Sequence, residues 1–186
     1  TLDNKVKEKV KYVFELKNQM GIANIHAREK ELLELAFKGL DSIPEVKILA
    51  NEHRDRLGII SFYADGIHYN LLVKLLNDLY GIQTRGGCAC AGTYGHFLLE
   101  MSYEKSMEIT DRIDHGDLSV KPGWVRWSIH PTTTDEEVRI MVEALKDIIS
   151  NIAVYSADYI YDKHYNHFKH KSETTDHYPV EEWFRL

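Results

Sequence analysis

Both cysteines of the chain, Cys88 and Cys90, lie in one glycine-rich loop, within the stretch GIQTRGGCACAGTYGH at residues 81–96. Glycines allow the positive backbone angles and the close approach to another surface that such a loop needs. Arg85 precedes the cysteines, and a helix predicted to begin near Thr93 would place its free N–H groups beside them. Both features lower the pKa of a thiol and make it a better nucleophile. The pattern therefore predicts Cys90 as a catalytic nucleophile, with two idle packing cysteines as the alternative.

Metal binding is a second chemistry that these residue types allow. Zinc would need the thiolates of Cys88 and Cys90 together with the imidazoles of His96 and His115, but a Cys-x-Cys pair does not match the usual zinc spacings. Another candidate is a set of C-terminal histidines at three-residue intervals, for which a solvated surface is the alternative: His164, His167 and His170. We assign no metal to either set and keep zinc as an alternative.

Arg126 is the remaining residue with recognisable binding chemistry. In GWVRWSIH at residues 123–130, apolar Val125 and Trp127 alternate with polar Arg126 and Ser128, which is the pattern of a half-buried strand. Arg126 is therefore predicted to point away from the core. An outward guanidinium forms bidentate hydrogen bonds with a carboxylate, and a surface salt bridge is the alternative.

The elements that must position these residues are visible as hydrophobic patterns. Helical periodicity predicts helices over four segments: 4–20, 22–38, 67–80 and 134–154. The last begins with a capping box formed by Thr134 and Glu137. Short β-branched runs predict strands at 46–50, 57–63 and 124–129, the first two antiparallel. We expect an α+β domain in which helices cover one face of a short antiparallel sheet.

The remaining segments have no clear period. Residues 101–120 are polar and are predicted to be irregular, and the aromatic, histidine-rich residues 155–186 are predicted to form an extended tail packed on the domain or on a partner. This divides the chain into a linking helix at 1–21, a domain at 22–154 and a C-terminal extension at 155–186.

Composition narrows the functional class. The formal net charge of −6 argues against a nucleic-acid partner, because phosphate binding needs a basic surface. No apolar run approaches the roughly 20 residues that span a bilayer, and the lysine-rich start TLDNKVKEKVKY lacks the apolar centre of a signal peptide. We therefore expect a cytoplasmic protein with reduced thiols and no membrane partner.

Three segments in order resemble the C-terminal part of class V aminotransferases, the fold-type I branch of pyridoxal phosphate (PLP) enzymes that includes cysteine desulfurases and selenocysteine lyases. They are GIANIHAREKELLELAFKGLDSIP, GIISFYADGIHYNLLVKLLNDLYGIQTRGGCACAG and VRWSIHPTTTDEEV, and the resemblance runs from about Gly21 to Ile152. It implies that Cys90 forms a persulfide, that Arg126 binds the substrate α-carboxylate and that Arg85 opens the loop as a second substrate-binding residue. His96 is a candidate for proton transfer.

The resemblance also implies a further domain, a substrate and partners that are not part of this chain. The family's PLP-binding lysine belongs to a large N-terminal domain, so we expect a fragment that has no cofactor-binding residue and is inactive alone. The implied partners are a small amino-acid substrate, the missing large domain, a second copy in a homodimer and a sulfur-acceptor protein. The loop Arg85-Gly-Gly-Cys-Ala-Cys90 lacks the two histidines usual in desulfurases. Two alternatives therefore stay open: a PLP-dependent aminotransferase, epimerase or lyase without a persulfide step, and a non-enzymatic zinc-binding or sulfur-carrying module.

Overall fold

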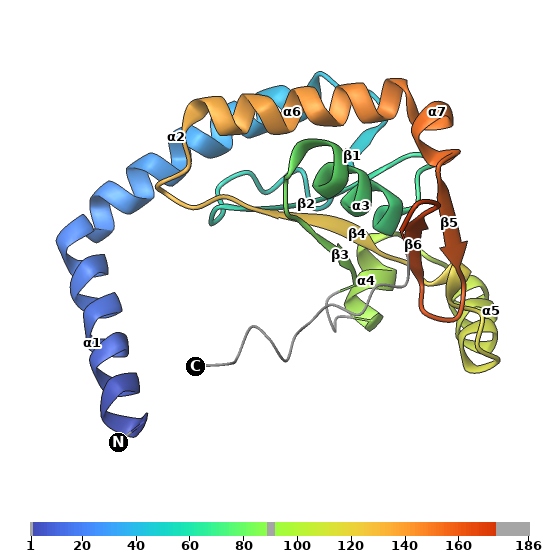
Figure 1. Ribbon diagram of the computed structural model, residues 1–186, viewed down its shortest axis with the longest axis horizontal. Coiled ribbons are helices and arrows are strands. Elements are labelled where there is room, and N and C mark those ends of the chain that lie inside the picture. Colours follow the sequence, from blue (N-terminus) through green and yellow to red (C-terminus); the bar gives the residue numbers. More distant parts are fainter. Residues whose placement is uncertain (1, 89–91, 174–186) are drawn as a thin grey trace.

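The computed structural model describes residues 2–88 and 92–173. Its centre is a four-stranded antiparallel sheet in the order β1-β2-β4-β3 (Figure 1). The strands are β1 (Val46–Ile48), β2 (Ile59–Ala64), β4 (Trp124–Ser128) and β3 (Arg85–Gly87). The predicted α+β class is confirmed, and β1, β2 and β4 occupy the three segments where strands were expected.

Apolar and polar side chains alternate along the strands, so one face of the sheet is the core face and the other is an open face. Ile60 lies opposite Trp127 and Phe62 opposite Val125, and these four side chains are buried. Residues directly opposite in an antiparallel pair share one face of the sheet. The neighbours of these apolar residues, including Ser61 and Arg126, therefore lie on the other face, as predicted for Arg126.

Three amphipathic helices cover the core face: α2 (Ile22–Asp41), α3 (Tyr69–Tyr80) and α6 (Asp135–Ser150) (Figure 1). Their buried residues, among them Leu40, Leu72 and Leu145, form one cluster with the sheet. The predicted capping box is present, because Thr134 Oγ1 accepts from the Glu137 amide and Glu137 Oε2 accepts from the Thr134 amide. The predicted helix at 134–154 is interrupted at Asn151, after which a short α7 (Ile152–Ser156) changes direction.

The helix α1 (Leu2–Met20) projects from this body (Figure 1). It ends at Gly21, whose φ of 79° belongs to the left-handed region that glycine tolerates. Its apolar residues Val6, Val10 and Val13 remain 52%, 50% and 63% exposed. No helix in the described part of the chain combines the length and the apolar character that crossing a bilayer requires.

The structure corrects the prediction of an irregular segment at 101–120. A helix, α5 (Tyr103–Asp114), and a 3-10 turn, η1 (Leu118–Val120), lie there. Ser102 caps α5 by accepting from the Lys105 amide, but Ile109 is its one buried residue. A helix with so little apolar surface gives almost no hydrophobic period, which is why the pattern missed it.

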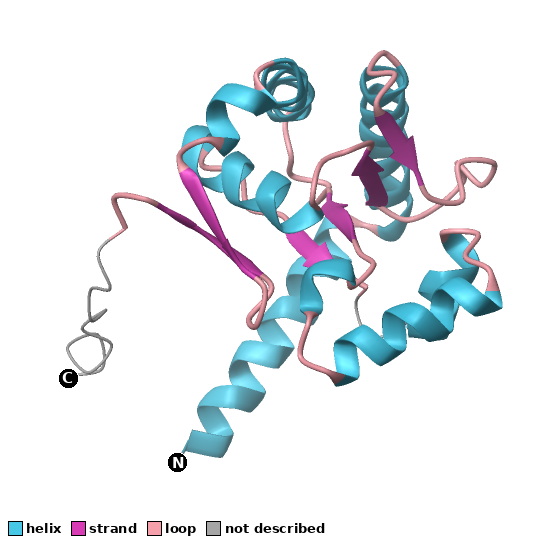
Figure 2. Cartoon of the chain, turned by 90° about the vertical axis from the view of Figure 1, so that its right-hand side faces the viewer, coloured by secondary structure: helices cyan, strands magenta, loops and turns pink. Residues whose placement is uncertain are grey.

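The C-terminal extension contains a β-hairpin that the sequence did not predict. Its strands, β5 (Tyr159–Asp162) and β6 (His167–His170), form a separate antiparallel pair beside the main sheet (Figure 2). The hairpin packs on α3, so the expectation that the extension lies against the domain holds for residues up to 173.

Candidate functional site

The register of the sheet brings the two predicted arginines together. Arg85 of β3 lies directly opposite Arg126 of β4, and Arg126 lies directly opposite Ser61 of β2. All three side chains therefore belong to the open face, in one row across the sheet. The strand β3 was not predicted, because Arg85-Gly-Gly has two glycines of low strand propensity, and its pairing with β4 is what places Arg85 beside Arg126.

The two guanidinium groups have no anionic partner among residues 2–88 and 92–173. Arg126 is half-buried, and its Nε is fully buried with no hydrogen-bond partner in that part of the chain. Like charges directly opposite each other in a sheet are destabilising, and an unpaired buried donor costs free energy. A carboxylate or phosphate bound between the arginines relieves both costs, so these residues fit an anionic ligand.

The short helix α4 (Gly92–Leu98) packs over the same face of the sheet. A Cβ at Gly95 would lie 3.1 Å from Cζ3 of Trp124, which is 5% exposed, and 3.8 Å from Cβ of Cys88. Trp124 and Arg126 are two residues apart on β4, so their side chains lie on the same face of the sheet. Cys88 therefore lies close to α4, and this helix begins at Gly92, close to the predicted start at Thr93.

His96 of α4 is held by a hydrogen bond to α5. Its Nδ1 lies 2.6 Å from Oγ of Ser106, and the imidazole is half-buried. This bond fixes the orientation of the ring. Ser106 was not singled out from the sequence, since it lies in the segment that showed no helical period.

Cys90 lies outside the described residues. Cys88 is a free, half-buried thiol beside Gly95.

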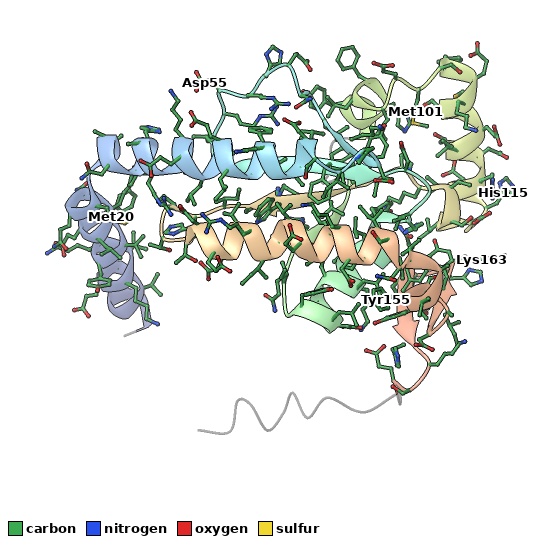
Figure 3. All side chains as sticks on the ribbon, turned by 90° about the horizontal axis from the view of Figure 1, so that it is seen from above. Met20, Asp55, Met101, His115, Tyr155 and Lys163 are labelled. Atoms are coloured by element: carbon green, nitrogen blue, oxygen red, sulfur yellow. The ribbon has the colours of Figure 1, made fainter. Side chains whose placement is uncertain are left out.

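His115, the other residue of the zinc alternative, lies at the C-terminus of α5, where its Nδ1 contacts the Asp111 carbonyl at 2.7 Å. Figure 3 places it at the end of the molecule opposite Met20. Searched over the described residues only, the histidines, cysteines and carboxylates form no group of three or more that could hold a metal.

Comparison with solved structures bears on the fold. The structure resembles apo cysteine desulfurase from Thermococcus onnurineus NA1, with a TM-score of 0.51, 21% identity and coverage of 72% of this chain and 28% of that one. That likeness shows that the chain has the fold of a segment of that protein, in agreement with the predicted α+β domain.

The amino-acid sequence gives the family. Residues 9–141 match the class-V aminotransferase family, and the chain belongs to it. It is 28% identical over 108 residues to the cysteine desulfurase of Haloferax volcanii, covering 52% of this chain and 25% of that protein. A probable cysteine desulfurase of Halobacterium salinarum is 37% identical over 71 residues, which is 38% of this chain and 17% of that protein. The chain thus spans a quarter or less of these relatives. The family resemblance is confirmed, and the family is one of PLP-dependent enzymes.

Proposed function

We propose that this chain is the C-terminal domain of a PLP-dependent cysteine desulfurase or selenocysteine lyase, which converts its amino-acid substrate to alanine through a persulfide or selenopersulfide on Cys90. The observation that carries the proposal is the pairing of Arg85 with Arg126 on the face over which α4 packs. The desulfurases among the relatives support the reaction, and the unpaired Nε of Arg126 supports an anionic substrate.

In the proposed reaction Arg126 binds the substrate α-carboxylate through a bidentate hydrogen-bonded pair, and Arg85 adds a second positive charge. Fixing the carboxylate orients the substrate's sulfur toward the loop, and such positioning contributes much of an enzymatic rate. PLP, when bound, takes up electrons from the substrate carbon skeleton. The Cys90 thiolate attacks the substrate sulfur, so that an S–S bond forms while the C–S bond breaks. The electron pair of the C–S bond stays on the substrate carbon, which takes up a proton to give alanine.

His96 is the proposed proton carrier in this scheme. His96 belongs to α4, which packs over the face of Arg126, and its ring is held by Ser106. With Nδ1 engaged by the serine hydroxyl, Nε2 accepts or releases the proton. Arg126 and Cys90 act on the substrate directly.

The organisation of the complete protein is also a proposal. We assign residues 1–21 as a linking helix to a large domain, because α1 leaves Val10 and Val13 exposed at 50% and 63%. Residues 22–154 form the domain and 155–186 the extension. The large domain would supply PLP and its lysine, and the complete enzyme would be a cytoplasmic homodimer that passes sulfur to an acceptor protein.

The decisive experiment is mass spectrometry of the complete, PLP-loaded enzyme after turnover with cysteine. The proposal expects a mass increase of one sulfur atom on the peptide that contains Cys90. The matched variants are Cys90→Ser, which should lose the increase and the release of alanine, and Cys88→Ser, which should keep both.

Consumption of an amino acid without any persulfide on Cys90 would contradict desulfuration. The same enzyme would then be assigned to the transamination, epimerisation or lyase chemistry of its family.

A further inference from the structure

The hairpin β5–β6 lies beyond residues 9–141, the part that matches the family, yet it is bound to the helix that supports the site. Asn166, at the turn of the hairpin, has a φ of 52° and directs its polar groups at the first turn of α3. Its carbonyl accepts from Nδ2 of Asn70, and its Nδ2 donates to the Tyr69 hydroxyl at 2.6 Å. The Tyr161 hydroxyl donates to Oδ1 of Asn166 at 2.9 Å. Both polar atoms of the Asn166 side chain are therefore engaged.

Aromatic rings reinforce this contact between the hairpin and α3. His68, which caps α3 by accepting from the Asn70 amide at 3.1 Å, has its ring centre 4.5 Å from that of Tyr69. On the other side the His68 ring lies 5.2 Å from Tyr161 and 5.3 Å from Phe168 of the hairpin. The start of α3 is thus held between the hairpin and the main sheet.

Tyr69 transmits this contact to the strands that carry the arginines. A Cβ added at Gly86 would lie 3.1 Å from Cδ2 of Tyr69, and one at Gly123 would lie 2.5 Å from its Cε1. Gly86 is the central residue of β3 and follows Arg85, whereas Gly123 immediately precedes β4. The Tyr69 ring, 7% exposed, therefore supports both strands from the core side while Arg85 and Arg126 extend from the opposite side.

Tyr69 is also electrostatically close to the cysteine loop. Burial raises the pKa of its hydroxyl, the hydrogen bond from Asn166 opposes that rise, and the negative charge of an ionised Cys88 adds to it. The hairpin, the tyrosine and the start of the loop are therefore neighbours.

We infer that the C-terminal hairpin supports the substrate site from the core side, and that Asn166 and Tyr69 are positioning residues that hold β3 in the register required for Arg85 and Arg126 to bind one carboxylate. The inference rests on the proposed function for the identity of the anion. β3 is a three-residue edge strand paired on one side only, so it has few contacts of its own to fix it. The Tyr69 ring beneath Gly86 supplies one, and the bond from Asn166 fixes that ring.

The test uses the 186-residue chain, two single variants, their double variant, one control variant and acetate as the probe. Asn166→Gly keeps a residue that tolerates positive φ and removes the amide, and Tyr69→Phe keeps the ring and removes the hydroxyl. Lys169→Ala is the control, since Lys169 is exposed on the hairpin and lies opposite Ile160 rather than against α3. NMR measures hydrogen exchange of the amides at 85–88 and the dissociation constant of acetate from the signals of the Arg85 and Arg126 Nε–H groups.

We expect both variants to accelerate exchange at 85–88 by about fivefold, the factor that corresponds to about 1 kcal/mol, a typical net hydrogen bond. The acetate dissociation constant rises measurably, and by no more than about the same factor, because the binding-competent fraction falls. The double variant should exchange no faster at 85–88 than Asn166→Gly alone, because the bond between Asn166 and the Tyr69 hydroxyl is already lost in that variant. Lys169→Ala leaves both quantities unchanged.

Unchanged exchange at 85–88, or unchanged acetate affinity, would overturn the inference. So would acceleration of the amides of α2 and α6 by the same factor, because that would show general destabilisation in place of positioning. These measurements need neither PLP nor turnover. A failure of the proposed function would appear separately, as an enzyme without a Cys90 persulfide whose exchange and acetate results are as expected here.

Discussion

At the scale of single residues, the open face of the sheet is arranged for binding at the expense of stability. Arg126 lies between Ser61 and Arg85, with a like charge directly opposite and its buried Nε unpaired within the described part of the chain. Such an arrangement is unfavourable until an anion is present. Residues that bind ligands are frequently suboptimal for stability in this way.

We therefore predict that Arg126→Met stabilises the free chain. Methionine keeps a long apolar stem and removes both the unpaired donor and the repulsion from Arg85, for a gain of about 1 kcal/mol. For a chain of this size the melting temperature should rise by about 2–4 °C, which differential scanning calorimetry measures. The same substitution should abolish substrate binding in the complete enzyme.

Arg112→Met is the matched control for that experiment. Arg112 is paired with Asp117, whose Oδ2 lies 2.7 Å from its Nη2, so removal of the guanidinium should bring no rise in melting temperature. A fall in the melting temperature of Arg126→Met would mean that Arg126 has a stabilising partner in the free chain, and the assignment of an anion site there would be wrong.

At the scale of elements, much of this fold was predictable because it depends on local patterns. The helices at 22–41 and 69–80 and the strands β1, β2 and β4 bury one face each, so their periods appear in the sequence. β3 and α5 escaped prediction because Gly86 and Gly87 carry no side chain and α5 buries only Ile109. The pairing of Arg85 with Arg126 is a matter of register between distant segments, which no local pattern contains.

The start of α3 contains a histidine, His68, that makes stability depend on pH near neutrality. Burial lowers the pKa of His68, so the folded chain keeps its imidazole neutral at pH values where the unfolded chain begins to bind a proton. Stability is then complete above the unfolded pKa of about 6.5 and is lost as the pH falls toward the lowered folded pKa.

We predict that His68→Asn weakens this acid-side loss. Asparagine still caps the helix but does not titrate, so the free energy of unfolding should depend less on pH between about 6.5 and 5. Urea denaturation at several pH values measures the slope. His164→Asn is the control, because His164 is an exposed histidine at the turn of the hairpin. An unchanged slope in His68→Asn would mean that the hairpin opens to solvent around His68.

At the scale of the whole molecule, the two ends of the chain relate differently to the central domain. The helix α1 leaves Val6, Val10 and Val13 half exposed or more, while the extension packs Tyr155, Tyr159 and Phe168 against the core cluster. It adds hydrogen bonds from Tyr155 to Asp147 at 2.7 Å and from Tyr159 to Asp78 at 2.9 Å. By these contacts residues 155–173 belong to the folded unit, whereas α1 leaves most of its apolar side chains exposed.

Two truncations test that asymmetry. Deleting residues 1–21 should change the free energy of unfolding by less than about 1 kcal/mol, because little apolar area is uncovered. Deleting 155–186 should cost about 3 kcal/mol or more, since burying one large side chain contributes about 1.5–3 kcal/mol. Urea titration of both fragments and the intact chain gives the comparison. If loss of 1–21 unfolds the chain while loss of 155–186 leaves it stable, α1 is part of the domain core and the extension is not, which would also remove the physical basis for a hairpin that positions the arginines.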